Sequence, residues 1–242
     1  YLNNNKDTII SLNNKASGEK KLKIKKGPNK FTWDMYYDGA SDFDGMVLWW
    51  ASLNGPKAVP GDYFVELNVN GVVQQKPFKI NIDPRSESSI KSMQEQFDFI
   101  NSINKTMDKA HKSIKTIRSI KSQLLKFTST YNQDDLSMLK EKATALSDDL
   151  SKIEKALYQT QNRSGQDPLN FPIRLTNKLG HLNSLVSMGD FSPTEQDIAV
   201  KEYLTDQINT NLEIFDKLMI EEVKSFNELF NNNKLNYLIS IE

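Results

Sequence analysis

Hydrophobic residues follow two different periods along the chain, and the change comes near Asp83-Pro84-Arg85. Before it, apolar positions recur at every second residue, most clearly where Tyr63, Val65, Leu67 and Val69 alternate with their neighbours. After it, apolar positions recur every three or four residues. A period of two is typical of half-buried strands, and the longer period is typical of amphipathic helices. The pattern therefore predicts an α+β protein of two domains, with a β domain at 1–85 and a helical domain at 86–242.

The β half contains about six short strand candidates separated by turn residues. The strands are expected at 7–12, 20–26, 30–36, 45–51, 63–69 and 78–82. Asn70-Gly71 lies between the last two, and this dipeptide is a strong hairpin signal because both residues tolerate positive φ. Short strands with regular turns predict an Ig-like (fibronectin III-like) antiparallel β-sandwich.

The helical half predicts helices at about 87–130, 134–161, 173–188 and 193–230. In the second of these, a heptad seam steps through Leu136, Leu139, Ala143, Leu146, Leu150, Ile153 and Leu157. Asn132 and Asp135 are expected to cap it. Ser192 is expected to cap the last helix, with Pro193 at its first position and Glu195 three residues after the cap. Each helix is apolar on one side, which predicts an all-α antiparallel bundle of three or four helices.

The composition restricts the classes of function. Lys plus Arg and Asp plus Glu both number 31, so the net charge is zero, and a general nucleic-acid binder would need a basic excess. No apolar run is long enough for a membrane span. The chain has no cysteine, which excludes disulfides, thiolate nucleophiles and cysteine-based zinc sites. A basic helix face that includes Arg118 and Lys121 is expected to pair with acidic residues of the final helix.

Four aspartates, Asp34, Asp38, Asp42 and Asp44, surround a glycine-containing loop. Several carboxylates in one loop suit a calcium ion, although the spacing is not that of an EF-hand. The simpler interpretation is a turn in which aspartates bond to their own backbone. His111 and His181 have no metal-site or triad context, so both are expected to be structural. The sequence indicates no catalytic residue and no cofactor, with calcium as the one alternative.

Aromatic residues are concentrated between Trp33 and Trp50. Exposed rings can stack on the apolar faces of sugars, which makes Tyr36, Tyr37, Trp49 and Trp50 candidate ligand-binding residues. Packing in the interior or at a domain interface is the alternative. Since neighbouring side chains in a strand point to opposite faces, one of the two tryptophans is expected to enter the core.

Several strings resemble the C-terminal region of large secreted bacterial proteins that carry sortilin-like, BNR-repeat β-propellers and are often labelled glycosyl hydrolases. Gly27-Pro28-Asn29-Lys30-Phe31-Thr32-Trp33-Asp34-Met35-Tyr36-Tyr37-Asp38-Gly39-Ala40 is similar to a GxNrFvWDlRYPGA string. Tyr36 and Asp38 replace the arginine and the proline of that pattern. Further matching strings are Gly45-Met46-Val47-Leu48-Trp49, Asp83-Pro84-Arg85, Gln96-Phe97-Asp98-Phe99, Gln166-Asp167-Pro168-Leu169-Asn170-Phe171-Pro172 and Gly189-Asp190-Phe191-Ser192-Pro193-Thr194.

The resemblance implies a location that is secreted, periplasmic or on a bacterial cell surface, and a β-propeller upstream in the same chain. It transfers no active site, because catalytic residues of such proteins would lie in the propeller. The resulting expectation is a non-catalytic C-terminal accessory module with a structural or docking role, whose partners are the propeller and a protein or glycan ligand. The alternative is a carbohydrate-binding module of a secreted glycoside hydrolase.

Overall fold

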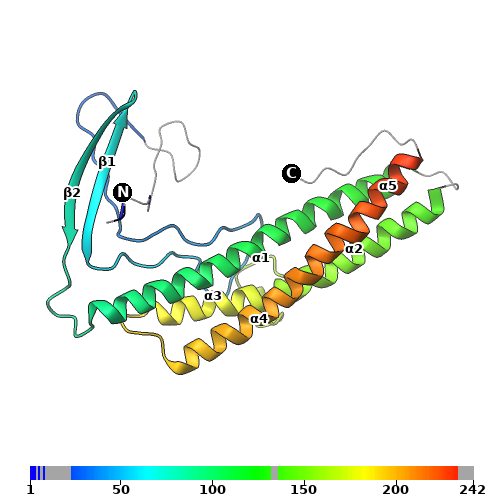
Figure 1. The fold of residues 1–242 in the computed structure, drawn as a ribbon. Helices are drawn as coiled ribbons and strands as arrows, with labels where there is room; N and C mark the ends of the chain where they lie inside the picture. Colours follow the sequence, from blue (N-terminus) through cyan, green and yellow to red (C-terminus); the bar gives the residue numbers. More distant parts are fainter. Residues whose placement is uncertain (4, 6–7, 9–22, 132–135, 234–242) are drawn as a thin grey trace.

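The computed structural model describes residues 1–3, 5, 8, 23–131 and 136–233. This part of the chain is mostly helical, and its only sheet has two antiparallel strands. The helices form an elongated bundle, and the two strands stand against one end of it (Figure 1). The N-terminus lies beside the strands.

The prediction of an Ig-like β-sandwich is wrong. The two strands are β1 (Gly61–Val69) and β2 (Val72–Ile80), joined by the expected hairpin turn. Asn70 and Gly71 both have positive φ, at 50° and 87°, as the dipeptide predicts. Leu2 adds an isolated antiparallel bridge to Phe64 on the outer edge of β1.

The expected strands at 30–36 and 45–51 are absent from the described residues, which contain only an isolated bridge between Tyr36 and Lys57 there. At 45–51 the chain instead turns at Asp44-Gly45 and bends at Trp49-Trp50. Side chains of Tyr158, Asn177 and His181 take its backbone hydrogen bonds in place of a neighbouring strand. Most of 7–12 and the first part of 20–26 lie outside the described residues; Thr8 forms a bridge to Leu2, and 23–26 has no strand.

The helices are α1 (Ile90–Thr130), α2 (Ser137–Leu157), α3 (Leu175–Val186), α4 (Glu195–Leu218) and α5 (Lys224–Asn232). A short 3-10 helix, η3 (Asp167–Leu169), precedes α3. A π-helical turn, η4 (Met219–Val223), joins α4 directly to α5, so the predicted last helix is continuous but locally widened. Helix α1 packs against α2, α3 and α4, and α2 packs against α4 and α5. Within the described residues, no helix has the length and apolarity needed to cross a bilayer.

The core follows the helical stripes. All seven residues of the heptad seam in and next to α2 are at most 4% exposed. On α1 the buried stripe includes Ile103, Met107, Ile114 and Ile117. Two isoleucines in the first turns of their helices are exposed, Ile90 of α1 at 54% and Ile198 of α4 at 42%.

The N-cap of α4 differs from the prediction. Thr194, and not Ser192, is the N-cap of α4, and it forms a capping box with Asp197. Ser192 donates instead to the Glu95 carboxylate on α1, at 2.7 Å. The predicted caps of α2, Asn132 and Asp135, lie outside the described residues. Residues 81–89 connect β2 to α1, whose N-cap is Ser89.

Candidate functional site

Residues 36–57, called the strap here, run across the helices with a turn at Asp44-Gly45 and a bend at Trp49-Trp50, and polar side chains of α1 bind their first half. Asp108 accepts a hydrogen bond from the Ser41 amide at 2.6 Å, and Nδ1 of His111 donates to the Ser41 carbonyl. Arg118 donates through Nη1 to the Asp44 carbonyl at 2.9 Å. Because these three residues lie along one helix, α1 fixes the path of the strap.

Helix α3 binds the second half of the strap in the same way. Asn177 accepts from the Trp49 amide and donates to the Trp49 carbonyl, both at 2.8 Å. Nδ1 of His181 donates to the Trp50 carbonyl at 2.7 Å, and the Ser52 amide donates to the Gly180 carbonyl at 2.9 Å. These hydrogen bonds satisfy the backbone of the strap as a neighbouring strand would, although the partners belong to a helix. Both histidines of the chain thus hydrogen-bond to the backbone of the strap.

The aromatic candidates separate into two pairs. Trp49 is half-buried and Trp50 is 72% exposed, with ring centroids 6.4 Å apart. Neither belongs to the hydrophobic core, so that expectation is wrong, because α3 holds the backbone of both residues at the surface through Asn177 and His181. Trp50 also has a φ of 51°, which is uncommon outside glycine. Tyr36 is 41% exposed, whereas Tyr37 packs edge-on against Phe97 of α1.

In the described part of the chain, the four aspartates are not brought together as a group of metal ligands. All of them belong to the described residues, among which no three His, Asp or Glu side chains are grouped to hold a metal ion. Asp34 accepts through Oδ1 from the Tyr36 amide at 3.0 Å, which is the turn-forming role that the sequence also suggested. Asp44 contributes its backbone carbonyl to Arg118. The structure therefore gives no support to the calcium alternative.

A buried ion-pair network, missed from the sequence, lies under the strap. Glu154 on α2 accepts from Nε of Arg118 at 2.7 Å and from Nζ of Lys121 at 2.9 Å, and its side chain is 5% exposed. Arg118 and Lys121 were expected to pair with the final helix. Burial by itself raises the pKa of Glu154, but the two hydrogen-bonded cations outweigh burial and hold this pKa below its ordinary value.

The network also holds the start of the strap against both helices. The Arg118 guanidinium lies over the ring of Phe43, 4.6 Å from its centroid. The Tyr158 hydroxyl, at the end of α2, accepts from the Val47 amide at 2.8 Å and donates to the Gly45 carbonyl at 3.3 Å. In the sequence, the only feature that indicated a buried role for Glu154 was its position directly after Ile153, a residue of the heptad seam.

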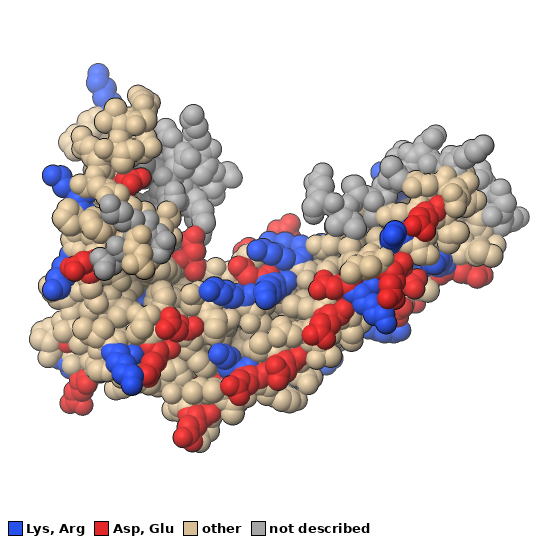
Figure 2. Space-filling model, viewed as in Figure 1, with Lys and Arg blue, Asp and Glu red and all other residues tan. Residues whose placement is uncertain are grey.

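The hairpin has an apolar face that the rest of the described chain covers only at its base. There, Tyr63 and Phe78 stack at 5.7 Å and contact Trp33 and Tyr1. Towards the turn, β1 presents exposed Val65 (36%), Leu67 (56%) and Val69 (53%) on the same face. On β2 the residues opposite them are Lys76, Gln74 and Val72. In Figure 2, charged side chains of both signs are scattered over the visible surface at this end of the molecule.

Comparisons with known proteins identify no relative. No protein-family model matches the chain, and no curated protein or solved structure matches it. The propeller-associated family suggested by the sequence motifs stays a prediction.

Proposed function

We propose that this chain is a non-catalytic docking module in which the hairpin binds a neighbouring β-rich domain. The observation that carries the proposal is the row of exposed apolar side chains that β1 presents on one face of the hairpin, Val65, Leu67 and Val69. Two strands by themselves bury too little surface to be stable in water, and here only the base of the hairpin is packed. A partner that covered Val65, Leu67 and Val69 would supply the missing burial.

The partner that suits this position is the β-propeller that the sequence resemblance implies upstream in the same chain. Tyr1 packs on Trp33 with ring centroids 4.8 Å apart, and Leu2 forms two backbone hydrogen bonds with Phe64 of β1. A domain that precedes Tyr1 would therefore emerge beside the hairpin and its apolar face (Figure 1). The long bundle would then project away from that domain as a rigid support.

Hydrogen exchange tests this proposal. The amides of the hairpin are compared between the isolated chain and the longer polypeptide that includes the upstream domain. We expect slower exchange at 65–72 in the longer polypeptide, and we expect Leu67→Asp to restore fast exchange there. Asn68→Asp is the matched control, because Asn68 lies next in sequence and on the opposite face of the hairpin. Equal exchange in the two proteins would overturn the proposal.

A second candidate function, carbohydrate binding, is favoured by one observation at Trp50. Its indole is 72% exposed, and its backbone is held in the left-handed region by the hydrogen bond from His181. Such a conformation costs about 1–3 kcal/mol and is concentrated at functional sites. A ring held rigidly in water is suited to stacking on a sugar.

A glycan array separates this candidate from the docking role. If Trp50 binds sugar, saturable binding is lost in Trp50→Ala and kept in Tyr203→Ala, since Tyr203 is a similarly exposed aromatic residue on α4. Absence of binding in the unmodified chain, or binding that survives Trp50→Ala, would leave the docking function alone.

A further inference from the structure

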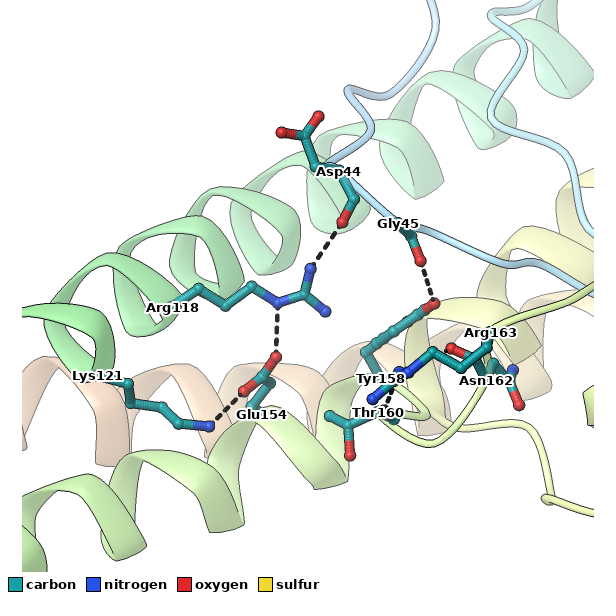
Figure 3. A pocket seen from close by; sticks show the side chains of 9 residues that line it. All are labelled: Asp44, Gly45, Arg118, Lys121, Glu154, Tyr158, Thr160, Asn162 and Arg163. Atoms are coloured by element: carbon teal, nitrogen blue, oxygen red, sulfur yellow. Dashed lines mark hydrogen bonds and ion pairs between the residues drawn. The ribbon is translucent and has the colours of Figure 1, made fainter. Parts of the chain in front are cut away.

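An open pocket of about 420 Å³ lies where the strap, α1 and the end of α2 meet, beyond the residues used in the proposed docking (Figure 3). The strap contributes Asp44 and Gly45 to its wall, and the loop after α2 contributes the stretch that ends at Arg163. The volume is that of a pocket for a small ligand. Its lining is dominated by charged and polar groups.

The side chains around the pocket carry an excess of positive charge. Arg118, Lys121 and Arg163 are cationic, and the carboxylate of Glu154 balances one of them. The other acidic residue of the lining, Asp44, turns its carboxylate away from the Arg118 guanidinium and offers its carbonyl (Figure 3). A ligand with a negative charge would complete the balance.

The cations retain hydrogen-bond donors for such a ligand. Arg118 uses Nε for Glu154 and Nη1 for Asp44, which leaves Nη2 without an acceptor among the described residues. Arg163 uses Nη1 for the carbonyls of Thr160 and Asn162, at 2.8 and 2.9 Å, which leaves Nε and Nη2. Planar guanidinium groups bind carboxylate and phosphate oxygens through paired N–H donors. The remaining donors therefore suit an oxyanion.

The side chain of Asn162 indicates, independently of the cations, that the ligand must also supply a hydrogen-bond donor. The residue is 2% exposed and lines the pocket, and its Oδ1 has no hydrogen-bond partner within the described part of the chain. A buried acceptor left unpaired costs about 1–3 kcal/mol, so a donor is expected opposite it. An oxyanion alone has no such donor, whereas a hydroxyl group supplies one.

We propose that the pocket binds a small hydroxylated anion of the sugar-acid or sugar-phosphate class. The carboxylate or phosphate accepts from Arg118 and Arg163, and a hydroxyl of the same molecule donates to Oδ1 of Asn162. Glu154 holds Arg118 and Lys121 in place at the edge of the site and is a positioning residue. The site involves no residue of the hairpin, so it does not depend on the docking function.

Calorimetric titration with glucuronate, glucose 6-phosphate, inorganic phosphate and glucose tests the proposal. We expect saturable binding of glucuronate, glucose 6-phosphate or both, which identifies the anionic group, and at least about tenfold weaker binding of glucose and of inorganic phosphate. Arg163→Gln is expected to weaken binding of the sugar anion about tenfold or more, while Arg85→Gln, a remote exposed arginine, leaves it unchanged.

Asn162→Ala distinguishes the two contacts. It is expected to lower the affinity for the sugar anion and leave weak binding of inorganic phosphate as it was, because phosphate uses only the cations. Thermal unfolding of each variant verifies that it is folded, and Leu67→Asp should bind the sugar anion normally. The proposal is overturned if neither sugar anion binds, if glucose binds equally well, or if inorganic phosphate binds as tightly as glucose 6-phosphate.

Discussion

The carboxamide of Asn177 and the backbone of Trp49 form a reciprocal pair of hydrogen bonds, in which each residue both donates and accepts at 2.8 Å. This is the pattern that a neighbouring strand would provide. Asn177 itself is 4% exposed, so water cannot easily replace either bond. The pair therefore fixes the strap, and the exposed Trp50 that follows, on the surface of α3.

Replacing Asn177 by alanine should destabilise the protein by about 2–4 kcal/mol, because it leaves the amide and the carbonyl of Trp49 unpaired in a partly buried place. Urea unfolding measures the loss. Asn211→Ala is the control: Asn211 also lies on a helix, but its side chain bonds only to a carbonyl of its own helix, so a change below about 1 kcal/mol is expected. Equal losses of stability in the two variants would show that the hydrogen bonds between Asn177 and Trp49 contribute no more than the bond of Asn211 within its own helix.

The strap approaches itself so closely that only glycine fits at Gly55. A Cβ there would overlap the carbonyl oxygen of Tyr37, which is backbone and has no flexible end to move. We expect Gly55→Ala to lower the free energy of unfolding by about 3 kcal/mol or more. Gly165→Ala, where a Cβ meets nothing within 4 Å, should change it by less than about 0.5 kcal/mol. Thermal and urea unfolding of the two variants check both values.

Buried His111 should make stability fall as the pH drops below its ordinary pKa of 6.5. Burial lowers the pKa of His111, although the Ser41 carbonyl and the Asp108 carboxylate oppose the shift. The unfolded chain therefore takes up the proton first. The contribution of His111 to the free energy of unfolding is fully present above pH 6.5. Below that pH it decreases by at most about 1.4 kcal/mol per pH unit, until the pH reaches the lower pKa of the folded state.

Unfolding free energies measured on both sides of this window test the role of His111. His111→Asn keeps a donor for the Ser41 carbonyl and should remove the pH dependence. His181→Gln, which changes a histidine on α3, is the control and should retain it. A pH dependence that persists in His111→Asn would assign it to another group.

Glu154 should make the stability of the protein depend on pH in a second, more acidic range. Its folded pKa lies below the ordinary 4.5, because hydrogen bonds from Arg118 and Lys121 outweigh the opposing effect of burial. Its contribution to stability is complete above 4.5 and is lost as the pH falls through the folded pKa. Acid titration followed by circular dichroism should show a shallower loss for Glu154→Gln.

At neutral pH, Glu154→Gln is expected to cost about 1–3 kcal/mol, because Arg118 and Lys121 lose their shared carboxylate but remain partly hydrated. Asp149→Asn removes the exposed pair with Lys152 and should cost at most about 1 kcal/mol. Similar losses in the two variants would mean that the buried network adds no more than a surface ion pair.

Much of the local structure could be predicted. The alternation around Tyr63 and the Asn70-Gly71 turn indicate the hairpin, and the seam from Leu136 to Leu157 indicates a helix that is buried on one side. The cap of α4 was displaced by two residues, because Ser192 finds Glu95 on another helix while Thr194 forms the capping box. The contact with Glu95 joins residues far apart in the sequence, and no local pattern reveals it.

The candidate site was less predictable. The residues Trp49 and Trp50 were identified, but neither enters a core, and no second sheet forms around them. The partners that matter, Asn177, His181, Arg118 and Glu154, are polar residues in helices and lack any motif. Their roles depend on which helix face meets the strap.

The sequence by itself determined the short-range features: where the chain is extended, where it is helical, and which helix faces are apolar. These follow from side-chain periodicity and turn chemistry, which act over a few residues. Only the tertiary structure decided what an extended segment pairs with. The segment at 45–51 reads as a strand, but side chains of Asn177, His181 and Tyr158 satisfy its backbone on a helical surface. Extended backbone needs hydrogen-bond partners of any kind, and their identity is set by packing between distant parts of the chain.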